Sequence, residues 1–254
     1  MVKGADLSYW NKNVNFDELI KQGIKFVILR IGYRGYGDGT IVKDDCFERF
    51  YSLAKEKGLG VGVYFFTQAI SSQEAVEEAE WCIKVLDGRK IDYPIYIDQE
   101  NSSGYPYGRA DYNTKRDFTN VCKSFCQHCE NKGFYAGIYA SESWFKYKVY
   151  YEELKQYDKW IAKWSIFKPT SKYGTYGMWQ NTNNLNVGGL RIDGNQAFYN
   201  YPEIMKTNGL NNYDKKAKHY DVIITDITEG DKDTILAKCE ELKIDHLTTI
   251  IEHE

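Results

Sequence analysis

Long apolar runs and a surplus of positive charge are both missing from this sequence of 254 residues. No stretch approaches the roughly 18 apolar residues that a membrane-spanning helix needs, so we expect no membrane insertion. The net charge of −3 leaves no basic excess to neutralise phosphates, which argues against nucleic acid as a partner. The N-terminal MVKGADLSYW has no basic region followed by an apolar one, and we therefore expect no secretory signal.

A spaced disulfide framework is also missing, although the chain has six cysteines. Cys122, Cys126 and Cys129 have the spacing of some iron–sulfur sites, which would make them cluster ligands. Together with Phe118 and Phe125, however, they fall on one face of a helix, which is the pattern of a buried stripe. We expect free thiols in a helix, with no metal and no cofactor.

Aromatic side chains are what the chain has in quantity: they make up 16% of it and include 22 tyrosines. Flat amphipathic rings serve core packing and stacking on sugar rings equally well. With 43% hydrophobic residues, the chain has the apolar content of a well-packed globular protein. Its length suits one large barrel, or a domain of about 200 residues with a small appendage.

Strand and helix patterns alternate through the first part of the chain. The expected strands are residues 3–8, 26–33, 60–67, 93–97 and 134–140, and the expected helices are residues 15–22, 45–57, 71–86, 114–132 and 143–157. The helical spacing then stops, and three strands follow at residues 159–164, 177–182 and 188–198. This order predicts an α/β fold, an irregular (β/α)5β3 TIM-like barrel over residues 1–206.

The fourth strand runs into YPIYIDQEN, residues 93–101, and ends in two carboxylates. Asp98 and Glu100 are two residues apart, so an extended chain points both side chains to one face, at the strand end where barrel enzymes hold catalytic groups. Repulsion between neighbouring carboxylates raises the pKa of one, which can then act as a general acid. Glycosidic bond cleavage uses such a pair. Considered alone, the pair is equally compatible with a helix cap or a solvated turn.

Two further acids are expected at the same rim. Asp6 follows the first strand, and Asp193 lies near the end of the last predicted strand, which adjoins the first in a closed barrel. Taken singly, each nearby aromatic fits the core better, but their joint placement favours a sugar-binding groove. The candidate substrate-binding residues are Tyr33, Tyr64, Tyr139, Trp164, Trp179 and Gln180.

Several motifs together resemble the glycoside hydrolase family 25 muramidases over about residues 3–200. They are DLSYW at Asp6, GVYFF at Tyr64, YIDQEN at Asp98 and Glu100, GIYAS at Tyr139, IAKW at Trp164, MWQ at Trp179 and RIDGN at Asp193. The resemblance implies an irregular β/α barrel that hydrolyses the β-1,4 bond between N-acetylmuramic acid and N-acetylglucosamine in bacterial peptidoglycan. One departure is Asn11, where the family commonly has glutamine.

The resemblance also implies roles for the acids. Glu100 would be the general acid, and Asp98 would orient the 2-acetamido group of the sugar or stabilise the oxazolinium that it forms. Asp6 and Asp193 would support this pair and hold the sugar. A carboxylate nucleophile and assistance by the acetamido group both remain open. Two alternatives also remain: a chitinase-like hydrolase of N-acetylglucosamine polymers, and a wall-binding protein without catalysis.

The C-terminal part differs from the barrel in character. Residues 207–218 are polar and are predicted as a linker, followed by a module over residues 219–254 with a helix at 231–243 between two strands. About 40 residues bury too little surface to fold alone, so we expect wall binding or self-association into a homo-oligomer. A muramidase with such a module resembles bacteriophage endolysins, which implies synthesis in the host cytoplasm and action on the cell wall after release.

Overall fold

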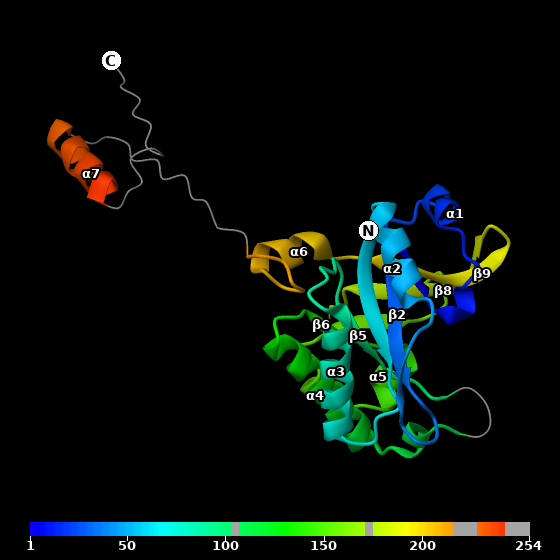
Figure 1. Cartoon of the computed structure of the whole chain (residues 1–254). Coiled ribbons are helices and arrows are strands. Elements are labelled where there is room, and N and C mark those ends of the chain that lie inside the picture. Colours follow the sequence, from blue (N-terminus) through cyan, green and yellow to red (C-terminus); the bar gives the residue numbers. More distant parts are fainter. Residues whose placement is uncertain (103–106, 171–174, 216–227, 242–254) are drawn as a thin grey trace. The chain divides into compact units, whose positions relative to one another are not determined.

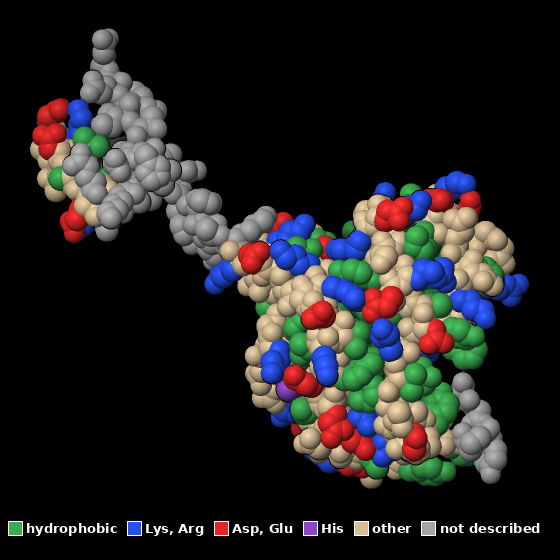
Figure 2. Space-filling view, in the orientation of Figure 1, with side chains coloured by type: hydrophobic (Ala, Val, Ile, Leu, Met, Phe, Trp, Pro, Cys, Tyr) green, Lys and Arg blue, Asp and Glu red, His purple; other side chains and the backbone are tan. Residues whose placement is uncertain are grey.

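The computed structural model describes residues 1–102, 107–170, 175–215 and 228–241. The chain divides into two compact units, Met1–Lys216 and Ala217–Glu254. The first unit is a β/α barrel, in which α2, α3 and α4 lie outside the strands (Figure 1). On the face seen in Figure 2, acidic and basic side chains are interspersed over this unit.

Eight strands close the barrel, and a ninth extends its sheet within the described residues. The barrel strands are β1 (Val2–Leu7), β2 (Phe26–Arg34), β4 (Gly60–Phe66), β5 (Ile95–Asp98), β6 (Ala136–Ser141), β7 (Asp158–Ala162), β8 (Met178–Val187) and β9 (Leu190–Ala197). Seven barrel strands, β1, β2, β4, β5, β6, β7 and β8, run parallel to one another, whereas β9 is antiparallel to both β8 and β1. The short strand β3 (Ile41–Lys43) pairs with β2 and was not predicted. The predicted irregular barrel is confirmed.

The helices bury the outer faces of the strands. They are α1 (Phe16–Lys21), α2 (Phe47–Glu56), α3 (Ser72–Leu86), α4 (Lys115–Asn131) and α5 (Glu142–Tyr147). Helix α3 begins where the Ser71 side chain accepts a hydrogen bond from Glu74 N. In α4, Cys122, Cys126 and Cys129 are buried free thiols, so the interpretation as a buried helix stripe is confirmed.

Aromatic rings fill the part of the barrel interior near the starts of the parallel strands. Tyr96 and Trp160 are almost fully buried, with ring centroids 5.3 Å apart. Glycine is required beside them, because a Cβ atom on Gly137 would lie 2.5 Å from the Tyr96 ring. Acidic groups lie at both ends of this packing: Asp158 begins β7 and accepts a 2.9 Å hydrogen bond from the Tyr96 hydroxyl, whereas Asp98 ends β5.

Two predicted segments differ from the structure. The helix expected at residues 143–157 is replaced by α5 and a 3-10 turn at Tyr151–Glu153, because Val149 and Leu154 turn into the core. The expected linker at 207–218 begins inside α6 (Tyr201–Asn208), its residues 216–218 lie outside the described residues, and residues 209–215 continue along the barrel. There Asn211 is fully buried and donates a 2.9 Å hydrogen bond to Tyr93 O. Its polar composition was misleading, because this amide satisfies backbone groups of the barrel.

In the second unit, helix α7 (Glu229–Glu241) matches the helix predicted at 231–243. The strands expected at 219–227 and 246–251 lie outside the described residues. None of the helices within the described ranges has the length and apolar character needed to cross a membrane.

Candidate active site

Four acidic residues from distant parts of the sequence meet at one rim of the barrel. Asp6 of β1 and Asp193 of β9 lie directly opposite each other in an antiparallel pair. Asp98 is the last residue of β5, and Glu100 follows two residues later. The charges of Glu100, Asp6 and Asp193 all raise the pKa of Asp98, which places the four groups within electrostatic reach of one another.

The reason for the position of Asp193 differs from the one predicted. We expected it near the C-terminal end of its strand, but it is the fourth residue of β9, in the first half. Because β9 runs antiparallel to β1, the first half of β9 reaches the rim where the parallel strands end. The expected convergence of the acids is therefore found, through a reversed last strand.

Each carboxyl group has its own degree of contact with water. Glu100 is exposed at the rim, yet the surrounding protein removes enough water to raise its pKa to about 7, and Asp193 adds repulsion. Asp193 is half-buried, and loss of water raises its pKa to about 6. Burial raises the pKa of Asp6 to about 8, with a further rise from Asp193. The groups therefore titrate over different ranges of pH, as acid–base catalysis requires.

Asp98 is the most deeply placed acid of the four, at 4% exposed. Its Oδ1 atom is buried, with no hydrogen-bond partner among the described residues. Burial is the largest cause that raises the pKa of Asp98 well above its usual range, whereas Arg30 lowers it. This oxygen is thus free to bind a donor group or to hold a proton.

Two buried amides stand behind Asp6. Gln180 Nε2 and Asn195 Nδ2 donate to Asp6 Oδ2 at 3.1 and 2.7 Å. Gln180 is 2% exposed, so it lies behind the acid instead of lining a groove as we expected. Asn195 was not predicted, although its place two residues after Asp193 puts it on the same face of the strand.

The predicted aromatic residues divide between the interior and the rim. Tyr64 and Tyr139 lie inside the barrel against Trp160, with ring centroids 6.0 and 4.5 Å from it. Trp164, two residues beyond β7, is 59% exposed. Trp179 does not join the group: it alternates with Gln180 along β8, and its indole donates to Lys163 O on the other face. Its predicted substrate-binding role is corrected for that reason.

Arg30 brings a positive charge to the site and was not predicted. A bulge in β2 lets Arg30 and Tyr33 face the same side, with the guanidinium 5.2 Å from the ring centroid. Arg30 also pairs with Asp44 at 2.7 Å. These three residues line a hollow of about 340 Å³, together with Tyr9, Trp10, Gly35, Tyr36, Lys43, Asp45 and Phe66. A charged residue within an otherwise apolar strand was the signal that could have identified Arg30.

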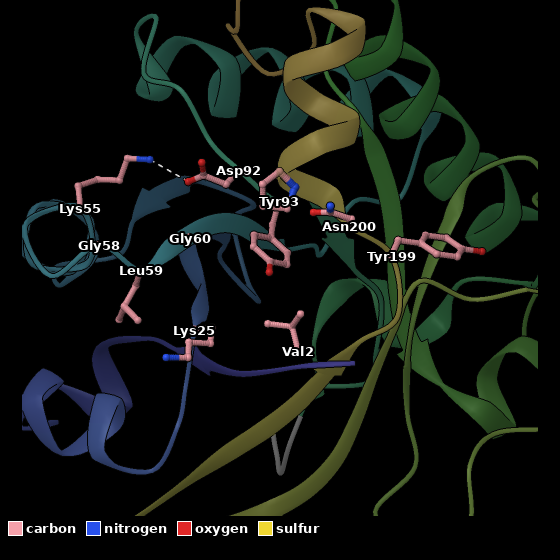
Figure 3. A pocket seen from close by; sticks show the side chains of 11 residues that line it. Val2, Lys25, Lys55, Gly58, Leu59, Gly60, Asp92, Tyr93, Tyr199 and Asn200 are labelled. Carbon is pink, nitrogen blue, oxygen red and sulfur yellow. Dashed lines mark hydrogen bonds and ion pairs between the residues drawn. The ribbon is translucent and has the colours of Figure 1, made fainter.

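A larger hollow, of about 430 Å³, lies at the opposite end of the barrel (Figure 3). Val2, Gly60 and Tyr93 line it, at or just before the starts of their strands, and Lys55 pairs there with Asp92 at 2.8 Å. None of the four converging acids lines it. Cavity size therefore does not locate the candidate site, whereas the convergence of carboxyl groups does.

Within the described residues, no group of three or more histidine, cysteine, aspartate or glutamate side chains is arranged to hold a metal ion. The chemistry available to the site from these side chains is proton transfer, charge stabilisation and, at Asp6, Asp98 or Asp193, carboxylate attack.

The chain is similar in sequence or in fold to several known proteins. An autolytic lysozyme of Clostridium acetobutylicum is 24% identical over 168 residues, which cover 66% of this chain and 47% of that protein, so the chain spans about half its length. A family 25 glycosyl hydrolase from Bacillus anthracis has the same fold, with a TM-score of 0.66 at 23% identity over 80% of this chain and 92% of that one. The catalytic domain of an endolysin from a Listeria monocytogenes bacteriophage has a TM-score of 0.63 at 20% identity over 81% and 97%.

The sequence profile described as "Glycosyl hydrolases family 25" matches residues 5–190, which hold Asp6, Asp98 and Glu100, whereas Asp193 lies three residues beyond the match. Because this match covers more than half of the chain, the protein belongs to glycosyl hydrolase family 25.

Proposed function

We propose that the protein is a muramidase, which hydrolyses the β-1,4 bond between N-acetylmuramic acid and N-acetylglucosamine in bacterial peptidoglycan. The observation that supports this most is the meeting of four carboxyl groups with raised pKa values at one barrel rim. Family membership agrees with it, and an autolytic lysozyme is among the relatives.

Glu100 is the proposed general acid. It is the most exposed of the four acids, and with a pKa of about 7 a large fraction keeps its proton near neutral pH. A glycosidic oxygen at the rim can therefore receive that proton as the bond to the sugar breaks. Asp98, with its unpartnered oxygen, is proposed to orient or stabilise the 2-acetamido group.

Asp6 and Asp193 are proposed to support this pair and to hold the sugar. Exposed rings beside the acids suit the apolar faces of a polysaccharide. Trp164 stands after β7, and Trp10, at 80% exposed, borders the hollow near Arg30. Trp10 follows β1 and Trp164 follows β7, so both exposed rings belong to the rim where the parallel strands end, which favours a chain-like substrate over a small molecule.

Analysis of the products identifies the reaction directly. Purified peptidoglycan of known composition is digested with the full chain, the new reducing ends are reduced with borohydride, and the fragments are identified by mass spectrometry. We expect reduced N-acetylmuramic acid at the new ends. Cleavage of chitin oligomers without cleavage of peptidoglycan would favour a chitinase-like hydrolase, and binding without new reducing ends would refute the enzymatic proposal.

We further propose an endolysin-type role, in which the protein acts on the cell wall after release from the cell that makes it. A structural neighbour that is a bacteriophage endolysin supports this proposal. The second unit, Ala217–Glu254, is proposed to bind the wall or to associate with a second copy, because so short a unit buries little surface.

A further inference from the structure

Asp6 is held by a pair of amides whose orientation is fixed. Both amides are 2% exposed, and both donate to the same carboxylate atom, Oδ2. On the far side of each amide, the carbonyl oxygen accepts from an indole: Asn195 Oδ1 from Trp160 at 2.8 Å, and Gln180 Oε1 from Trp164 at 3.0 Å. An indole N–H can donate but cannot accept, so the amide oxygens must face the tryptophans and the amide nitrogens must face Asp6.

Gln180 differs from Asn195 in what it joins. Besides Trp164, its oxygen accepts from the hydroxyl of Tyr139 at 3.0 Å. The indole partner of Asn195 is 1% exposed, whereas Trp164 is 59% exposed at the rim. The buried amide of Gln180 therefore connects the exposed ring of Trp164 with the buried carboxyl group of Asp6.

We propose that Gln180 is a positioning residue of the glycosidase site, which fixes the carboxylate of Asp6 and the exposed ring of Trp164 through opposite ends of one amide. This inference rests on the proposed glycoside hydrolysis for its kinetic consequences, although the hydrogen bonds stand without it. A sugar that stacks on Trp164 meets a ring whose tilt is set by Gln180. Together with Asn195, the same side chain occupies Oδ2 of Asp6 and leaves the other oxygen for Asp193.

The pKa of Asp6 is a quantity that loss of packing around Gln180 alone would not change. An amide N–H that donates to a carboxylate favours its ionised form, so Gln180 and Asn195 lower the pKa of Asp6 against the effect of burial. The other titratable groups that act on Asp6, or on which its charge acts, are Asp193, Glu100, Asp98, Tyr64 and Tyr139. Replacement of Gln180 by methionine removes the donor and leaves these groups in place.

The first test uses the full chain with ¹³C-labelled aspartate carboxyls, followed by NMR from pH 4 to 10. Asp6 is assigned by the loss of its signal in Asp6→Asn. We expect the titration midpoint of Asp6 to rise by about one pH unit in Gln180→Met. The matched control is Gln196→Met, the same change one residue after Asn195. The side chain of Gln196 makes none of the contacts with Asp6 described above. A midpoint of Asp6 that is unchanged in Gln180→Met would overturn the proposal.

The second test uses Gln180→Glu, which keeps an oxygen for Tyr139 and Trp164. Protonated, the new carboxyl can donate to Asp6; ionised, it repels Asp6. We expect the rate of reducing-end release, relative to wild type, to be at least about tenfold higher at pH 5 than at pH 8. An equal ratio at both values would contradict the proposal. If the wild type releases no reducing ends, the proposed function fails, and the titration of Asp6 still decides this inference.

Discussion

At the scale of single residues, the four acids of the site differ in pKa because they differ in exposure to water and in the charges near them. Glu100 reaches solvent and Asp98 does not, although the two are adjacent on one face of the chain. Asp6 is placed against Asp193, so that ionisation of one opposes ionisation of the other. Asp193, with a pKa of about 6, is therefore ionised at pH values where Glu100 still keeps its proton.

The proton on Glu100 sets the expected response of activity to pH. Because its pKa is raised to about 7, Glu100 is protonated below that value and loses its proton above it. We expect kcat/KM for reducing-end release to fall as the pH rises through about 7. Initial rates from pH 4 to 9 provide the measurement, and a rate that keeps rising from pH 7 to 9 would be incompatible with Glu100 as the acid.

Stability should depend on pH through Asp6 in a predictable direction. Its pKa is about 8 in the folded chain against an ordinary value of 3.8, so the folded state binds this proton more tightly. The stabilisation that the folded chain gains from this proton on Asp6 is complete below about pH 4 and is lost as the pH rises through about 8. We expect the free energy of unfolding in urea to fall more steeply from pH 5 to pH 8 in the wild type than in Asp6→Asn. Equal slopes would mean that Asp6 titrates normally.

At the scale of elements, strand β2 and helix α3 are joined by a buried ion pair. Arg34 Nε lies 2.7 Å from Glu78 Oε1, and the two side chains are 6% and 0% exposed. Thr67 at the end of β4 donates to the other oxygen of Glu78 at 2.7 Å. Arg34 also donates to Gly39 O, so the pair ties the loop after β2 to the helix. This loop includes Tyr36 on the hollow beside the candidate site.

Loss of that pair should be costly. Glu78→Ala leaves the Arg34 charge buried without its closest partner, and we expect the free energy of unfolding to fall by about 3 kcal/mol. The matched control is Glu153→Ala, which breaks the exposed pair with Arg116 and should change stability little. Urea unfolding of the two variants measures the difference. If the free energy of unfolding fell by a similar amount in both variants, burial would not make the Arg34–Glu78 pair more important for stability than an exposed pair.

Local sequence patterns predicted elements more reliably than their directions and contacts. The apolar runs of β2 and β4 identify buried strands, and the spacing of Cys122 and Cys126 identifies a helix face. The antiparallel course of β9 has no local signature, because its residues alternate as they would in a parallel strand. Asn211 was assigned to a linker for its polarity, since only the folded barrel supplies the backbone groups that it binds.

The sequence predicted the acidic residues of the candidate site better than the residues that hold them in place. Asp98 and Glu100 follow an apolar run, which is a strong local signal. Gln180 and Trp179 are neighbours in sequence but face opposite sides of β8, and the sequence alone does not fix which one points inward. Arg30 depends on a bulge in β2 for its place, and bulges have weak sequence signals.

At the scale of the whole molecule, closure of the barrel is what brings the site together. Strand β1 pairs with β2 on one side and with β9 on the other, so Asp6 and Asp193 become neighbours although they lie near opposite ends of the barrel sequence. The unit Ala217–Glu254 is separate from this closure. Its contribution to wall binding or assembly can therefore be tested by its removal.

We predict that the full chain self-associates through this second unit, because a unit of its size buries too little apolar surface alone. Sedimentation velocity of the full chain should give a concentration-dependent dimer or larger species. The chain shortened to Met1–Lys216 should sediment as a monomer and keep its activity on soluble wall fragments. A full chain that stays monomeric at every concentration would refute self-association.

Whether Glu100 is the general acid is tested by the release of reducing ends from purified peptidoglycan by wild type, Glu100→Gln and Glu152→Gln. Glu152 is exposed on the 3-10 turn after α5 and serves as the matched control. We predict a loss of about 100-fold or more in Glu100→Gln, because the amide has no proton to give, and little change in Glu152→Gln. A Glu100→Gln variant that cuts peptidoglycan at the wild-type rate would show that Glu100 is not the general acid.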